Sequence, residues 1–360
     1  MEETRKIGLG QTVCLLCLIR CFSLFSFSYV ENDMENLSAK FLGIFLGVLI
    51  DAIVFIPTIF VFKENSGGIF PLARDVSKTF EKIISAIYFI FAIYSAVILS
   101  IQFNGFFQST IYHGGEKIFF IIILAMTAVY GSKKGLEPCA RASAIFFVII
   151  LLISIGGMFF LFPDINLLNL STPLYKGFSP VLRLAIFYAS ESFPICFILA
   201  FGKNINCGGN KAFYIYLLAT FLIFETVSFL VITVLGEFGA AQPYCVFSLA
   251  SSSKGEILKR YDSFYMFSWV FTAVCKMTML CFFSAYCLKP FFPKVKPETK
   301  SLFSAVLICI LSYIFLEKER AFELALKLNS WGAFLVLMAV ILPTLVLFFW
   351  KKNKKGGIKP

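Results

Sequence analysis

Apolar residues fill ten long stretches of this chain, and short polar segments separate them. A hydrocarbon core of about 30 Å needs about 20 residues of helix. Backbone groups in lipid must be hydrogen-bonded within their segment, and the stretches lack the alternation of barrel strands. They predict an all-α integral membrane protein with about ten transmembrane helices. The predicted spans are 8–27, 41–62, 83–107, 117–131, 142–162, 180–202, 211–236, 264–288, 300–316 and 331–350.

The composition agrees with a membrane protein and excludes a soluble one. Hydrophobic residues make up 59% of the 360 positions and charged residues 15%, more apolar surface than a soluble domain of this size can bury. The longest connection, from about 237 to 263, is too short for a separate folded domain, so we expect one transmembrane domain over 1–360. No cleavable signal peptide is expected, because the first stretch lacks a small-residue cleavage pattern.

The distribution of charge orients the chain. With the N-terminus placed inside, the inner segments hold 20 of the 32 Lys and Arg residues, and the outer segments hold 10. This bias predicts that both termini are cytoplasmic. The Lys-rich tail 351–355 is expected to touch anionic lipid. The net charge of +11 therefore indicates membrane topology rather than nucleic-acid binding. The inner segments are 1–7, 63–82, 132–141, 203–211, 289–300 and 351–360.

Enzyme, metal and cofactor chemistry find little support in the sequence. Most of the eleven cysteines lie within apolar stretches. Cys14, Cys17 and Cys21 share one helix face and are better explained as small buried residues than as metal ligands. The single histidine, His113, falls in an outer loop. With no phosphate-binding glycine loop and no nucleophile–base pair, we expect no cofactor and no enzymatic activity.

Five charged residues fall inside the predicted spans, away from their ends: Arg20, Asp51, Glu191, Glu225 and Lys276. Each costs on the order of 2.5–3.5 kcal/mol at the centre of a helix on insertion scales. They must therefore face protein, water or one another. Such residues commonly mark the path or binding site of a ligand in membrane proteins.

The sixth span carries the strongest candidate site. Tyr188, Ser190, Glu191 and Ser192 surround a carboxylate with small or polar groups, and Pro194 follows. Proline removes a backbone donor and frees an upstream carbonyl, which permits an unwound turn. Transporters place ligand sites at such broken helices. The alternative is a kinked helix whose carboxylate is paired for packing.

The first span shows a weaker form of the same pattern. Arg20, Cys21, Phe22 and Ser23 interrupt an apolar stretch without proline or glycine. Arg20 could bind a ligand carboxylate or pair with Glu191. It could also extend to the outer interface.

The eighth and third spans complete the candidate site. Lys276 stands about halfway along the eighth span, where a cation could replace a bound sodium ion or act as a fixed counter-charge for Glu191 or Glu225. Tyr94 of the third span is expected to contact a small ligand. Such polar groups more often join one helix to another.

Several stretches resemble the B subunit of spore nutrient germinant receptors, within the amino-acid/polyamine/organocation transporters. Residues 130–141 are similar to that family's tyrosine, basic, Lys-Gly, hydrophobic-Glu and Ala-Arg stretch. Residues 162–170 are similar to its outer Pro-Asn/Asp segment. Ser190-Glu191 stands at the place of its Gly-Glu, and residues 274–277 resemble its Val-Lys-hydrophobic stretch. The order and spacing of these stretches cover nearly the whole chain.

The resemblance implies two inverted five-helix repeats, about 8–162 and 180–350, with helices one and six broken around a pocket. It implies a complex with an A subunit and a lipoprotein C subunit in the spore inner membrane, which senses amino acids or similar nutrients. Two features depart from the family. Arg20 and Phe22 replace small residues and would shrink or recharge the pocket, and the acidic segment 28–37 lacks the expected proline.

Two functions follow. The first is a germinant receptor subunit, in which a nutrient shifts a permease-like equilibrium because it binds the two states with different affinity. The alternative is a proton-coupled secondary transporter of amino acids. In the transporter, Glu191 or Glu225 would titrate, or Lys276 would replace sodium. A- and C-type receptor genes beside this one would favour sensing over transport.

Overall fold

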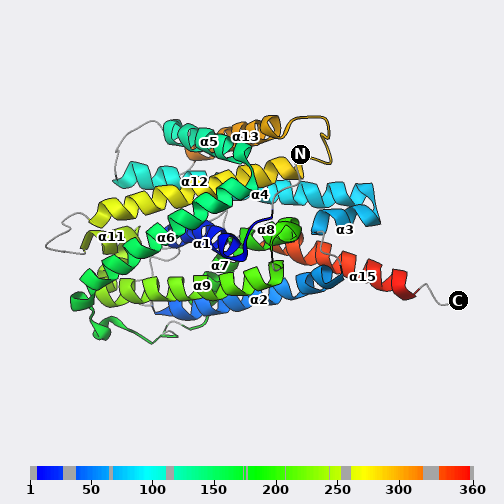
Figure 1. Cartoon of the computed structure of the whole chain (residues 1–360). Coiled ribbons are helices and arrows are strands. Elements are labelled where there is room, and N and C mark those ends of the chain that lie inside the picture. The colour runs from blue at the N-terminus through cyan, green and yellow to red at the C-terminus, as the bar shows by residue number, and fades with distance from the viewer. Residues whose placement is uncertain are drawn as a thin grey trace.

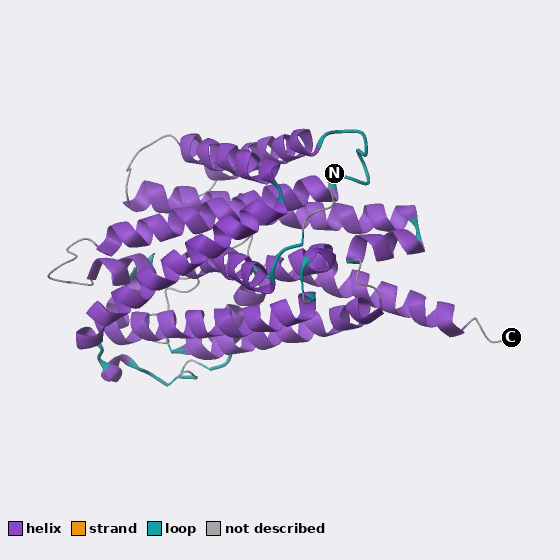
Figure 2. Ribbon diagram, in the orientation of Figure 1, coloured by secondary structure: helices purple, strands orange, loops and turns teal. Residues whose placement is uncertain are grey.

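The computed structural model describes residues 6–26, 38–64, 68–110, 117–172, 174–175, 177–206, 208–242, 244–252, 261–318 and 332–356. Helices make up nearly all of this part of the chain, and most of them run along one axis of an elongated bundle (Figure 1, Figure 2). The only β-type pairing in these residues is an isolated bridge between Ile7 and Ile205.

The predicted apolar stretches consist mainly of helix in the described part of the chain. Among the described residues, eight helical segments are long and apolar enough to cross a membrane, and α1 is a shorter apolar helix. The helices are α1 (Leu9–Ser26), α2 (Ala39–Glu64), α3 (Ile69–Val76), α4 (Lys78–Thr110), α5 (Lys117–Lys134), α6 (Leu136–Leu161), α7 (Ser179–Ser190), α8 (Phe193–Phe201), α9 (Gly209–Leu230), α10 (Gly236–Ala241), α11 (Cys245–Ser252), α12 (Tyr261–Cys287), α13 (Pro297–Lys318) and α15 (Leu342–Gly356).

Predicted inner segments meet one another at one end of the bundle. The Ile7 amide donates to the Asn204 carbonyl at 2.8 Å, which joins the start of α1 to the segment after α8. Lys133 and Glu298 form an ion pair at 3.3 Å, which joins the end of α5 to the start of α13. α3 and the end of α15 lie at this same end in Figure 1.

Predicted outer segments meet at the opposite end. The Ser171 amide donates to the Ser38 hydroxyl at 3.1 Å, and the Asn166 amide donates to the Thr233 carbonyl at 3.0 Å. These contacts and those among the predicted inner segments lie at opposite ends of the bundle.

The first helix differs from the expectation. α1 is continuous from Leu9 to Ser26, so the chain is unbroken through Arg20 and Ser23, where an interruption was predicted. The stretch contains no proline or glycine to remove a backbone hydrogen bond, and Arg20 finds a polar partner on another helix. His113 and residues 28–37 lie outside the described residues.

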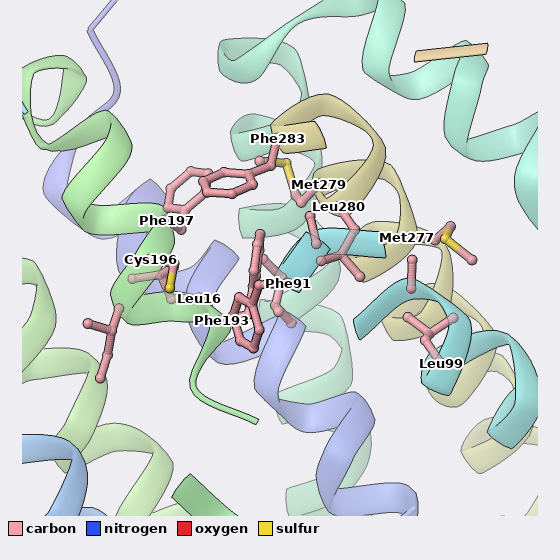
Figure 3. Packing of buried hydrophobic residues seen from close by; sticks show 14 of the residues in the cluster. Leu16, Phe91, Leu99, Phe193, Cys196, Phe197, Met277, Met279, Leu280 and Phe283 are labelled. Carbon is pink, nitrogen blue, oxygen red and sulfur yellow. The ribbon is translucent and has the colours of Figure 1, made fainter. Parts of the chain in front are cut away.

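An aromatic layer fills the centre of the bundle where α4, α8 and α12 meet (Figure 3). The rings of Phe193 and Phe283 lie 5.1 Å apart with their planes at 78°, and the rings of Phe91 and Phe193 lie 6.4 Å apart. All three side chains are buried. Tilted aromatic contacts of this kind add to the stabilisation that burial provides.

Two glycines bring α2 against α7. A Cβ atom at Gly43 would lie 2.5 Å from Cβ of Leu184, and one at Gly47 would lie 2.6 Å from Cβ of Tyr188. Small residues four positions apart let membrane helices approach closely. Asp51 is four residues further along α2 and therefore lies on the same face, toward the end of α7.

Gly47→Ala tests this packing with a single methyl group. The new methyl would meet the Cβ and ring atoms of Tyr188, so we expect the free energy of unfolding to fall by about 1–3 kcal/mol, the range for overpacked cores. Gly10→Ala on α1 is the matched control, because a Cβ there has no neighbour within 4 Å. The measurement is thermal denaturation of both variants in detergent. Equal midpoints for the two variants would show that α2 and α7 are not in close contact.

Candidate functional site

The sixth apolar stretch is divided into two helices at its predicted position. α7 ends at Ser190 and α8 begins at Phe193, with Glu191 and Ser192 in non-helical conformations between them. Pro194 stands in the first turn of α8 and cannot donate to the carbonyl of Ser190, which explains why the helix stops here. The carboxylate of Glu191 is thus held where the helix is interrupted.

Glu191 is bound by residues from two other helices. Its Oε2 accepts a hydrogen bond from Nζ of Lys276 on α12 at 2.6 Å and another from Oγ of Ser23 on α1 at 2.9 Å. Lys276 Nζ also lies 3.2 Å from the Ser23 hydroxyl. The side chains of Lys276 and Glu191 are 3% and 9% exposed. A buried ion pair in this setting depends on both members, because either one alone would be an uncompensated charge.

The side chain of Arg20 on α1 is buried against α7 and α9 and does not extend to the membrane–water interface. Its Nη2 donates to the Tyr188 carbonyl at 2.5 Å, and its guanidinium lies 3.9 Å from the centre of the Tyr188 ring. Nε and Nη1 of Arg20 have no hydrogen-bond partner among the described residues. Unsatisfied buried donors are costly, so these two groups are suited to bind an oxygen that the protein itself does not provide.

Asp51 adds a second carboxylate on the other side of the break. The Ser192 hydroxyl donates to Oδ1 of Asp51, and both side chains are buried. Asp51 also interacts electrostatically with Arg20. The cluster therefore combines two cations, Arg20 and Lys276, with two carboxylates, Asp51 and Glu191. In their ordinary charged forms these four groups sum to zero.

Aromatic side chains enclose the cluster on both sides along the axis. Trp269 precedes Lys276 by two turns of α12 and is fully buried, with its ring 4.8 Å from Phe103 and 5.7 Å from Phe22. On the other side, α8 carries Phe193 into the aromatic layer of Figure 3. Aromatic side chains therefore lie beside the cluster on both α12 and α8.

Most of the predicted site residues gather here. Arg20, Ser23, Tyr188, Glu191, Ser192 and Lys276 are joined by the contacts above, and Phe22 lies 5.4 Å from Lys276 Nζ. Tyr94 interacts electrostatically with Glu191.

Three other predicted positions stand apart from these contacts. Ser190 bonds back to the Phe187 carbonyl at 2.7 Å. Cys21 is buried in the apolar core, and no described contact links it to the cluster. Half-buried Glu225 on α9 likewise has no described contact with the cluster.

The predicted ligand set omitted Asp51, although its charge within the span was noted. The signal that identifies it is the spacing of Gly43, Gly47 and Asp51 at four-residue intervals. This spacing places two small residues and an acid on one helix face. The two glycines predict that this face of α2 packs closely against another helix, and Asp51 lies on the same face.

Comparison with known proteins identifies the family and the fold. Residues 40–321 match the family model described as spore germination protein. A solved structure of Mhp1, a nucleobase-cation-symport-1 family transporter in a closed conformation with bromovinylhydantoin bound, is similar over 92% of this chain and 78% of that chain, with a TM-score of 0.60 and 13% identity. At this identity the likeness concerns the fold alone. No curated protein sequence matches the chain. The chain belongs to the spore germination protein family and is an integral membrane protein with a permease-like fold.

Proposed function

We propose that this protein is the membrane subunit of a spore nutrient receptor and that it binds a small zwitterionic nutrient, such as an amino acid, at the break between α7 and α8. The observation that carries the proposal is the buried, interrupted helix whose Glu191 is paired with Lys276 and Ser23. A neutral cluster of two cations and two carboxylates accepts a zwitterion without leaving a net charge in the membrane.

The contacts suggest how such a ligand binds. Its ammonium group competes with Lys276 for Glu191, and its carboxylate takes the two donors of Arg20 that lack partners. Exchange of the ion pair for the ligand loosens α12 from the break, so the ligand has different affinity for the ion-paired and rearranged states. That difference is what allows it to shift the equilibrium between them. Phe22 and Tyr94 form the surrounding wall. Cys21 and Ser190 are not assigned to it, because Cys21 packs in the apolar core and the Ser190 hydroxyl donates to the Phe187 carbonyl.

Further parts of the proposal rest on the family. In this scheme, residues 8–162 and 180–350 form two inverted repeats within a single transmembrane domain. The protein acts in the spore inner membrane with both termini cytoplasmic, beside an A subunit and a lipoprotein C subunit. The segregation of basic inner segments at one end supports this orientation.

Deletion of the gene in the spore-forming host tests the receptor role. Mutant spores are expected to lose germination in response to at least one nutrient and to regain it when the gene is restored. Other receptors that act on the same nutrient must be deleted in the test strain. If the deletion spores still respond to every nutrient of the panel at wild-type concentrations, the receptor role is refuted.

Arg20→Lys tests the carboxylate contact. Lysine keeps the positive charge but loses the planar pair of donors that a carboxylate binds. A lost charge-assisted hydrogen bond is worth about 1.5–3 kcal/mol, so we expect the nutrient concentration for half-maximal germination to rise about 10- to 100-fold. The control is Arg183→Lys near the outer start of α7, which should leave that concentration unchanged. Equal responses of the two variants would exclude Arg20 from the pocket.

Amino-acid transport is a second candidate, because the fold resembles a protein named as a transporter over most of its length. Purified protein in liposomes with a pH gradient separates the two functions. Uptake of a labelled amino acid that depends on the gradient would favour transport. Binding of the same amino acid without uptake would favour sensing.

A further inference from the structure

Two cavities lie next to each other at the end of the bundle where α4 begins and α12 ends. The first has a volume of about 380 Å³ and lies between α3, the start of α4 and the segment after α12. The second, of about 400 Å³, lies between α5, the end of α12 and the start of α13. Tyr286, Lys289 and Pro293 line both. Neither cavity is lined by residues of the Glu191 cluster, so this region is separate from the proposed nutrient site.

The first cavity is strongly basic. Arg74, Lys78, Lys82 and Lys289 line it together with a single acid, Glu81. None of the four cations forms an ion pair with another residue in the described part of the chain. Unpaired cations facing a shared hollow repel one another, and an anion between them removes that repulsion.

The apolar part of the wall gives the cavity a fixed shape. The rings of Phe70 and Tyr286 lie 5.3 Å apart with their planes at 64°, and Phe70 is buried. The basic side chains thus surround a packed aromatic wall. The preference for positive charge on the inner side of a membrane explains how many basic residues are present. It does not explain why they converge on one walled cavity from segments more than 200 residues apart.

The neighbouring cavity adds Lys300, together with Lys133 and Glu298, which pair with each other at 3.3 Å. Lys300 in the first turn of α13 is 5% exposed, and its charge is repelled by that of Lys289. The helices α4 and α13 both begin in this region, at Lys78 and Pro297. The start of a helix carries partial positive charge from its unpaired amide groups, which favours phosphate. The ends of α5 and α12 lie at the same cavities and carry partial negative charge, so the positive potential comes from the lysine and arginine side chains.

The position of the cavity along the bundle determines which anions can reach it. The candidate span Lys78–Thr110 begins at the cavity and the candidate span Tyr261–Cys287 ends there, so phospholipid headgroups would lie at this level if these helices cross the membrane. Arginine and lysine together suit a phosphate oxygen cluster, because arginine binds in a bidentate manner and lysine acts as a point charge. We propose that the basic cavity lined by Arg74, Lys78, Lys82 and Lys289 is a binding site for a phosphate group, provided by an anionic phospholipid or by a soluble phosphorylated compound.

The test uses the purified full-length protein in detergent and follows its thermal midpoint. One arm titrates phosphatidylglycerol against phosphatidylcholine, and a second arm titrates inorganic phosphate against chloride at equal ionic strength. We expect the midpoint to rise with phosphatidylglycerol if a lipid is the source, and with inorganic phosphate if a soluble compound is the source. Failure of both to raise the midpoint above their controls would overturn the proposal.

Two triple variants assign the effect to the cavity. Lys78→Gln/Lys82→Gln/Lys289→Gln is expected to raise the half-saturating concentration of the active anion by about tenfold, from three lost contacts of exposed lysines. Lys203→Gln/Lys211→Gln/Lys294→Gln removes the same charge from three exposed lysines outside both cavities and should change it by no more than about twofold. Equal shifts in the two variants would mean that the anion binds diffusely. If the first variant does not fold, Lys289→Gln alone replaces it, with an expected shift of about threefold.

Discussion

Glu191→Gln is expected to raise the nutrient concentration for half-maximal germination by about 100-fold. The substitution keeps the size of the side chain but removes the negative charge that binds Lys276 and, in the proposed mechanism, the ammonium group of the nutrient. A hydrogen bond to a charged group contributes about 1.5–3 kcal/mol, and each 1.4 kcal/mol corresponds to a factor of ten. Germination of spores that carry only this receptor is the measurement, with the protein level in the membrane determined in parallel.

Glu225→Gln provides the matched control for this prediction. Glu225 is also a carboxylate within a candidate span, on the half-buried face of α9, but no described contact joins it to Lys276 or Ser23. The response of Glu225→Gln spores should equal that of wild type. If both variants lose the response equally, the effect comes from charge within the membrane in general and not from the break between α7 and α8.

The double variant Glu191→Gln/Lys276→Met is expected to recover stability without recovering the response. Removing one member of a buried ion pair costs about 3–5 kcal/mol, because the other charge stays buried without a partner. Removing both members takes away that penalty, so the double variant should unfold closer to wild type than either single variant. Its nutrient response should stay as low as that of Glu191→Gln, because Glu191, the carboxylate proposed to bind the ammonium group, is still missing.

Thermal denaturation of the four proteins in a double-mutant cycle measures this coupling. Contacting residues show interaction energies of about 0.5–3 kcal/mol, and the pair at 2.6 Å should lie in the upper part of that range. Additive effects of the two single substitutions would contradict the ion pair. Recovery of the nutrient response in the double variant would contradict the role of Glu191 in binding while leaving the ion pair intact.

The sequence predicted the positions of the helices because long apolar stretches have few other structures available in lipid. The break at Ser190, Glu191 and Ser192 was also predictable, since Pro194 removes a specific backbone hydrogen bond. Both are local properties. The expected interruption of α1 had no such local cause, because Arg20 to Ser23 contains only residues that a helix accepts, and the structure has a continuous helix there.

The sequence did not determine which charged residues pair with one another. Lys276 had two possible acidic partners in the spans, and nearly uniform apolar helices do not reveal which face turns inward. The structure pairs it with Glu191 and brings Ser23 to the same carboxylate oxygen. The place of Asp51 at the break was recognisable only through Gly43 and Gly47. These glycines allow the close approach of α2 and α7 that brings Asp51 against Ser192.

Direct binding of a germination-active nutrient to the purified protein tests the central claim. Calorimetric titration compares wild type with Glu191→Gln and with Glu225→Gln, after each protein has been shown to be folded. The account predicts binding by wild type and Glu225→Gln and a loss of about 100-fold in affinity for Glu191→Gln. Binding by Glu191→Gln with the affinity of wild type would contradict the assignment of the nutrient site to the break between α7 and α8.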